Sequence, residues 1–115
     1  MATLEQLRQT VMDVLTEQAK FYRRGFAREP QTEIVQVFDT VHDHFQIAAL
    51  SWEGETQIYN IFFHLDIKGE KVWIQVNNTD ESIAELLLER GLQKSDIVLG
   101  LQPPYKRPYT GYASE

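Results

Sequence analysis

The first part of the chain carries apolar side chains at intervals of three and four residues, which predicts an amphipathic helix over residues 3–24. Thr3 suits the N-cap, and Gln6 follows it at the spacing of a capping box. Arg23 and Arg24 place positive charge at the negative end of the helix dipole, and a glycine follows to end the helix. The stripe expected to face the core is Leu4, Leu7, Val11, Val14, Leu15, Gln18 and Phe21.

From residue 33 the apolar period changes to two, which is typical of strands. Short polar or glycine-containing breaks separate the extended stretches, so neighbours should pair antiparallel as a meander. The predicted strands are residues 33–39, 45–52, 56–68 and 70–77.

The rest of the chain predicts a second helix over residues 80–90 and a short extended piece over residues 97–100. Three prolines in residues 102–115 indicate an irregular tail, since proline fixes φ and removes a donor. We therefore expect one α+β domain spanning residues 1–115, with a four-stranded antiparallel sheet and both helices on one of its faces.

Strict alternation divides the predicted sheet into two faces. The face expected under the helices carries Tyr59, Ile61, Phe63, Leu65, Ile67, Val72, Ile74 and Val76. The other face is expected to carry Phe38, Leu50, Trp52, Ile58, Phe62 and Trp73 among Gln36, Gln46, Asn60, His64, Asp66 and Gln75. A mixture of large aromatics and amides resembles a protein–protein interface more than plain solvent surface, unless the tail folds across it.

Composition narrows the classes of function. The 115 residues include no cysteine, which excludes disulfides, thiolate metal sites and a cysteine nucleophile. The net charge is −6, and residues 33–100 hold twelve acidic but four basic side chains, which disfavours an autonomous nucleic-acid binder. No apolar run is long enough for a bilayer, and the first residues lack the order of a signal peptide, so we expect a cytoplasmic protein and no membrane contact.

Histidine and aspartate residues are the candidates for acid–base or metal chemistry. His64 and Asp66 should share a strand face, and His-x-Asp spacing can hold a metal, but further ligands are not apparent. We therefore expect no metal and no cofactor. The candidates for general acid–base catalysis are Asp39, Asp43, His44, His64 and Asp66, and no nucleophile or phosphate-loop motif accompanies them. No catalytic residue is assigned, while a hydrolase-like enzyme using His64 and Asp66 stays open as an alternative.

Basic residues near the two ends of the chain are the candidates for DNA contact. Aromatic residues are interleaved with them, as in surfaces that stack on bases and contact phosphates. The candidate residues are Arg23, Arg24, Arg28, Lys106 and Arg107. A small DNA-binding protein is therefore a second alternative.

Several short motifs resemble the XisI family in order and spacing. They are Phe38-Asp39, Asp43-His44-Phe45-Gln46, Trp52, Ile58-Tyr59, His64-Leu65-Asp66-Ile67, Gly69, Val72-Trp73-Ile74-Gln75, Thr79-Asp80, Ile83-Ala84, Gly91-Leu92, residues 96–101, Pro104 and residues 107–111. Two places depart from the family pattern: Leu101-Gln102 stands where members often have an aromatic residue and a histidine, and Asn77-Asn78 where many have Asp-Gly.

The resemblance implies an fdxN element excision controlling factor, a type of protein found mainly in cyanobacteria. Such factors assist a separate recombinase in programmed DNA excision and are encoded beside a second factor, XisH. No catalytic residues of the family can be carried over.

We therefore predict a non-enzymatic accessory factor that binds a XisH-like protein or forms a homodimer, with any contact to DNA indirect. The residues expected to bind the partner are Trp52, Phe62, Trp73, Tyr105, Tyr109 and Tyr112.

Overall fold

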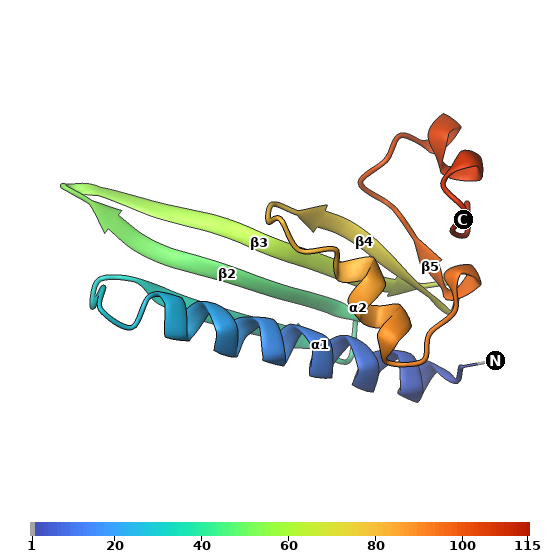
Figure 1. The fold of residues 1–115 in the computed structure, drawn as a ribbon, viewed down its shortest axis with the longest axis horizontal. Helices are drawn as coiled ribbons and strands as arrows, with labels where there is room; N and C mark the ends of the chain where they lie inside the picture. The colour runs from blue at the N-terminus through green and yellow to red at the C-terminus, as the bar shows by residue number, and fades with distance from the viewer. Residues whose placement is uncertain (1) are drawn as a thin grey trace.

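The computed structural model describes residues 2–115 and shows one long helix beneath a twisted sheet (Figure 1). Helix α1 spans Leu4–Gly25 and begins at the predicted N-cap. The Thr3 backbone N–H donates to Gln6 Oε1 at 2.8 Å, and the Gln6 N–H donates to Thr3 Oγ1 at 3.1 Å, which closes the capping box. The capping box thus satisfies two of the N–H groups that have no partner within the helix. No helix in the part of the chain that the structure describes is long and apolar enough to cross a membrane.

The sheet contains five strands in the order β1-β2-β3-β4-β5. Strands β1 (Glu33–Asp39), β2 (His44–Glu53), β3 (Thr56–Lys68) and β4 (Lys71–Asn77) form the predicted antiparallel meander. The prediction of a four-stranded sheet is wrong in one respect, because β5 (Ile97–Val98) pairs with β4 in parallel. A connection through a helix allows this parallel pairing, which a short hairpin cannot make.

The other C-terminal elements are shorter than predicted. Helix α2 spans Ile83–Glu89 and not residues 80–90, because the Ser82 side chain caps it by accepting from the Glu85 N–H at 3.4 Å. The 3₁₀ helix η1 (Lys94–Asp96) precedes β5. The tail is not wholly irregular, because it contains a second 3₁₀ helix, η2 (Pro104–Tyr109).

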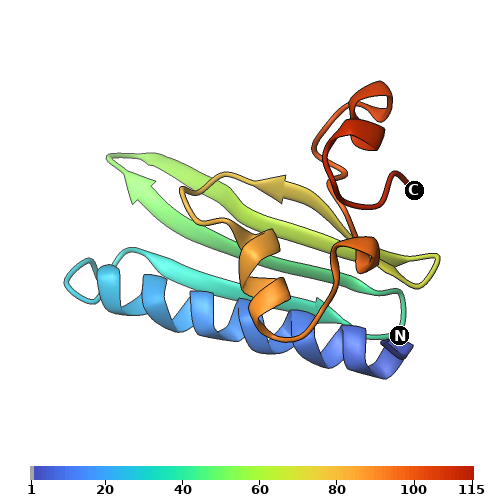
Figure 2. The same ribbon diagram turned by 45° about the vertical axis from the view of Figure 1, so that its right-hand side comes forward.

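One hydrophobic core lies between the sheet and the two helices. Both helices cover the same face of the sheet, as Figure 2 shows. From α1 the core takes Leu7, Val11, Val14, Leu15 and Ala19, while Leu4 and Phe21 of the predicted stripe are exposed. Strand and α2 residues that complete the core include Phe45, Ile47, Phe63, Leu65, Ile67, Val72, Ile74, Ile83 and Leu87.

A β-bulge at Phe62 reverses the faces of the outer half of β3. Ile47 pairs with Phe63 and Ala48 with Ile61, which leaves Phe62 between them without a partner in β2. Phe62 and Phe63 are both buried, and the Phe62 ring packs 4.7 Å from the Tyr22 ring of α1. An inserted residue moves every side chain beyond it to the opposite face.

The assignment of faces is therefore wrong for part of the sheet. Tyr59 and Ile61 turn away from the helices, and Tyr59 is 53% exposed, whereas Phe62 belongs to the core. A second register shift, at Gln75, puts Val76 opposite His64 and outside the core. Gln36 and Phe38 of β1 were expected on the outer face, but they face α1.

Candidate functional site

Two histidines and an aspartate meet on the sheet face that the helices leave uncovered. Antiparallel pairing sets His44 of β2 directly opposite Asp66 of β3. Asp66 Oδ1 lies 2.7 Å from His44 Nδ1 and 2.8 Å from His64 Nε2, so both rings point at the same oxygen. The three side chains form the one group of histidine and acidic residues with metal-ligand geometry among residues 2–115. We call it the His44–His64–Asp66 cluster.

Side-chain exposure differs among the three residues of the cluster. The side chain of Asp66 is 12% exposed, that of His64 26% and that of His44 56%. Burial alone would raise the pKa of Asp66, but the hydrogen bonds from His44 and His64 outweigh it and hold that pKa below its usual value. The hydrogen bond to Asp66 in turn raises the pKa of His44.

Three further polar side chains surround the cluster. Gln75 Nε2 donates to Asp66 Oδ2 at 3.3 Å. Gln46 Oε1 lies 3.4 Å from His64 Nδ1, and Gln46 Nε2 donates to the Tyr59 hydroxyl at 3.0 Å. Tyr59 reaches this network only because the bulge turns it to the outer face.

The other carboxylates proposed for acid–base chemistry lie outside the network. Arg8 binds both oxygens of Asp43, with Nε–Oδ1 at 2.7 Å and Nη2–Oδ2 at 3.1 Å. Asp39 accepts from the backbone N–H groups of Val41 and His42 and lies 2.9 Å from His42 Nδ1. These contacts stabilise the β1–β2 turn, where Asp43 has a φ of 61°, and leave neither carboxylate free to face a substrate.

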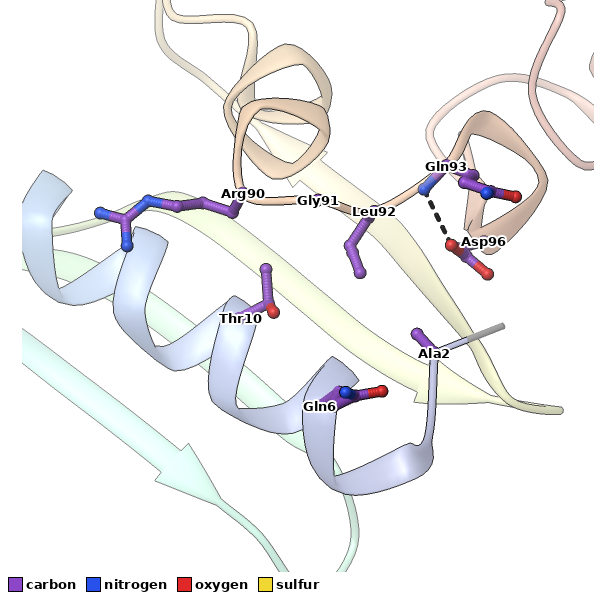
Figure 3. Close-up of a pocket in the computed structure, with 8 residues that line it drawn as sticks. All are labelled: Ala2, Gln6, Thr10, Arg90, Gly91, Leu92, Gln93 and Asp96. Carbon is purple, nitrogen blue, oxygen red and sulfur yellow. Dashed lines mark hydrogen bonds between the residues drawn. The ribbon is translucent and has the colours of Figure 1, made fainter.

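The surroundings of the His44–His64–Asp66 cluster bear on the chemistry that it can do. It contains no hydroxyl or thiol nucleophile, and it lies on an open face where water has access. A hollow of about 310 Å³ lies elsewhere, between the start of α1 and the loop after α2 (Figure 3). Asp96 is the carboxylate that lines it, and it accepts from the Gln93 N–H at 2.8 Å, so no acid–base pair faces this hollow.

Large apolar side chains lie on the same open face. Trp52 is 51% exposed, Tyr59 53% and Val37 46%. Trp73 is half-buried between Lys68 Nζ, 4.1 Å from its ring centroid, and the Arg107 guanidinium, at 5.2 Å. We define Val37, Trp52, Tyr59 and Trp73 as the open-face patch.

The tail covers only the Trp73 end of the open-face patch. Figure 1 places η2 beyond β4 and β5, at the opposite end of the molecule from the β2–β3 turn. Trp52 lies next to that turn, near the end of β2. Tyr105 and Tyr109 of the predicted partner-binding set are 71% and 88% exposed at this end. Tyr112 is half-buried and packs against the core. The structure thus separates the predicted tail residues from Trp52, and it removes Phe62 from the surface.

The basic residues proposed for DNA contact lie at two distant places. Arg23 donates to Gln36 Oε1 at 2.7 Å and to the Ile34 carbonyl at 3.2 Å. Arg107 donates to the carbonyls of Gln102 at 3.0 Å and Gly100 at 3.2 Å. The end of α1 and η2 lie at opposite ends of the molecule in Figure 1, so the fold does not join them into one basic surface.

Sequence reasoning placed His64, Asp66 and Gln75 on the open face correctly but did not find the network that connects them. His44 joins His64 and Asp66 because β2 pairs with β3, and the spacing of residues along the chain does not show which strand residues lie opposite each other. Tyr59 was missed because alternation was continued through the bulge. The adjacent aromatic pair Phe62-Phe63 was the available signal, since regular alternation puts one of the two rings on the face that the helices leave open, whereas a bulge lets both lie in the core.

Comparisons with known proteins agree on one family. The family model described as XisI protein matches residues 1–114. A crystal structure of a XisI-like protein from Anabaena variabilis ATCC 29413 is 36% identical, with a TM-score of 0.79 over 92% of this chain and 97% of that one. The fdxN element excision controlling factor XisI from the same organism is 25% identical, with a TM-score of 0.79 over 95% of this chain and 96% of that one. No curated protein matches the chain.

Proposed function

Because the chain belongs to the XisI family, we propose that it is a non-enzymatic factor that controls excision of a DNA element through contacts with another protein. The partner is a XisH-like protein, and the contact surface is the open-face patch. DNA is reached through that partner.

The observation that carries the proposal is the exposure of large apolar side chains on one sheet face. Both helices pack on the other face, and the tail covers only the neighbourhood of Trp73. Apolar surface left in water costs about 25 cal/mol per Å², so a patch that includes half-exposed Trp52 and Tyr59 favours association. Tryptophan and tyrosine are also the residues that most often dominate binding energy at interfaces.

The polar part of the same face suits a specific contact. Gln46, Gln75 and the His44–His64–Asp66 cluster lie beside the aromatic side chains and hold one another in place by hydrogen bonds. A pre-organised polar surface loses little conformational entropy when a partner binds.

The experiment compares two variants with equally exposed aromatic residues. Trp52 lies on the open face and Phe21 on α1, and each is 51% exposed. Purified protein is mixed with a purified XisH-like protein, and the affinity is measured by calorimetry. We expect Trp52→Ala to weaken binding at least about thirtyfold, as for an interface anchor worth about 2 kcal/mol, and Phe21→Ala to leave it unchanged.

Two results contradict the proposal. If the native proteins do not bind each other at micromolar concentration, the partner is wrong. If Phe21→Ala weakens binding as much as Trp52→Ala does, the surface is wrong. Light scattering on the protein alone tests whether a second copy of the chain covers the patch instead. In that case the protein would be a dimer, and Trp52→Ala would dissociate it.

A further inference from the structure

We propose that His44, His64 and Asp66 bind a divalent transition-metal ion, with Zn²⁺ as the first ion to test. The inference goes beyond the proposed function and does not depend on it. It rests on the convergence of two imidazole nitrogens and one carboxylate oxygen from two neighbouring strands.

The side chains supply a recognised set of ligands. Nitrogen atoms of two histidines and an oxygen of one carboxylate bind zinc at three positions and leave at least one position open for water or another ligand. The same donor set also suits other first-row divalent ions. Here the three ligand atoms lie within 4.8 Å of one another, and His44 Nδ1 and His64 Nε2 both approach Asp66 Oδ1.

The fit requires the two histidine rings to move. Zinc–nitrogen and zinc–oxygen bonds of about 2.0–2.2 Å set tetrahedral ligand atoms about 3.3 Å apart. The nitrogen–oxygen distances are 2.7 and 2.8 Å, so each ring must withdraw from Asp66 by about half an ångström. The two ring nitrogens, which lie within 4.8 Å of each other, must reach the same spacing. The side chain of His44 is 56% exposed and has room to do so.

The surrounding amides support the same assignment. A metal-binding histidine usually donates its second ring N–H to a neighbouring acceptor, which fixes the tautomer that presents the other nitrogen to the metal. Gln46 Oε1 lies 3.4 Å from His64 Nδ1, the nitrogen that does not face Asp66. Gln46 is oriented by its own donation to Tyr59, and Gln75 holds the second oxygen of Asp66. Two of the three ligands, His64 and Asp66, therefore have a partner outside the cluster.

The histidine content of the chain offers a matched control. There are three histidines, and His42 lies outside the cluster beside Asp39, with a side chain that is 73% exposed. Chelator-treated protein without its partner is titrated with ZnCl₂ by calorimetry, and Co²⁺ absorption reports the coordination. We expect one ion per chain with a dissociation constant of micromolar or below, and a rise in melting temperature with added Zn²⁺.

The variants separate a built site from adventitious binding. His44→Gln and His64→Gln should each weaken Zn²⁺ binding at least tenfold, while His42→Gln should leave it unchanged. His44→Gln changes an exposed side chain, so it should stay folded even if substitution of the more buried Asp66 does not. Absence of saturable binding, or equal losses from His42→Gln and His44→Gln, would overturn the proposal. Because the partner is absent from this titration, either result leaves the proposed protein contact to its own test.

Discussion

Replacing Phe62 tests whether the bulge in β3 is formed as described. Alternation alone puts Phe62 on the open face, where its loss would weaken partner binding. The bulge instead buries it to 8% exposure against Tyr22, so its loss should weaken folding. The substitution Phe62→Ala therefore distinguishes two registers of the same strand.

The expected size of the effect follows from burial. Phenylalanine-to-alanine changes in cores cost about 3–5 kcal/mol, including the cavity that remains. Phe62 lies at the edge of the core beside a hollow that it lines with Phe21 and Tyr22, so neighbours can relax and the lower end of that range applies. For a domain of this size, about 3 kcal/mol corresponds to a fall in melting temperature of roughly 12 °C.

Thermal and urea denaturation followed by circular dichroism measure the change. Trp52→Ala is the matched surface control, and its free energy of unfolding should change by less than about 0.5 kcal/mol. If Phe62→Ala leaves stability unchanged but lowers affinity for the partner, the bulge and the assignment of faces that depends on it are wrong.

Three further predictions concern single positions. Glu70→Gly should raise the free energy of unfolding by about 0.5–1 kcal/mol in urea denaturation, because Glu70 has a φ of 62°. An added Cβ at Gly100 would lie 2.4 Å from Gln75 Oε1 and 3.2 Å from a carbonyl oxygen, so Gly100→Ala should lower stability by about 1 kcal/mol in the same assay; no change would contradict this packing. The backbone N–H of His42 and then its side chain lower the pKa of Asp39, which stabilises the fold above the usual aspartate pKa and loses that effect as the pH falls through the lowered one. In an NMR titration, His42→Ala should therefore restore the Asp39 pKa only in part, since the backbone donor remains.

Local signals were enough to predict much of the fold. The capping-box spacing of Thr3 and Gln6 predicted the start of α1. Short breaks between alternating segments predicted the antiparallel order of β1 to β4. These features depend on residues that are close in the sequence. The parallel strand β5 was described only as an extended piece, because two residues carry no sign of which strand they pair with.

Features that depend on register were not predictable in the same way. The bulge at Phe62 changes which side chains share a face, and a single extra residue has no marker in a pattern of period two beyond the pair Phe62-Phe63. The His44–Asp66 contact joins residues 22 positions apart and exists only once β2 and β3 are in register. The spacing along the chain therefore linked two residues of the candidate site, His64 and Asp66. His44 joins them only through the pairing of β2 with β3.

NMR can map the surface of this protein that contacts the partner. The chain has two tryptophans, Trp52 and Trp73, and both indole N–H groups give resolved probes on that face. On addition of the XisH-like protein, we expect the Trp52 indole signal to shift or broaden, while backbone signals around Phe21 on α1 stay in place. Perturbation of the α1 signals with an unchanged Trp52 signal would show that the partner binds the helical side, and would contradict the account.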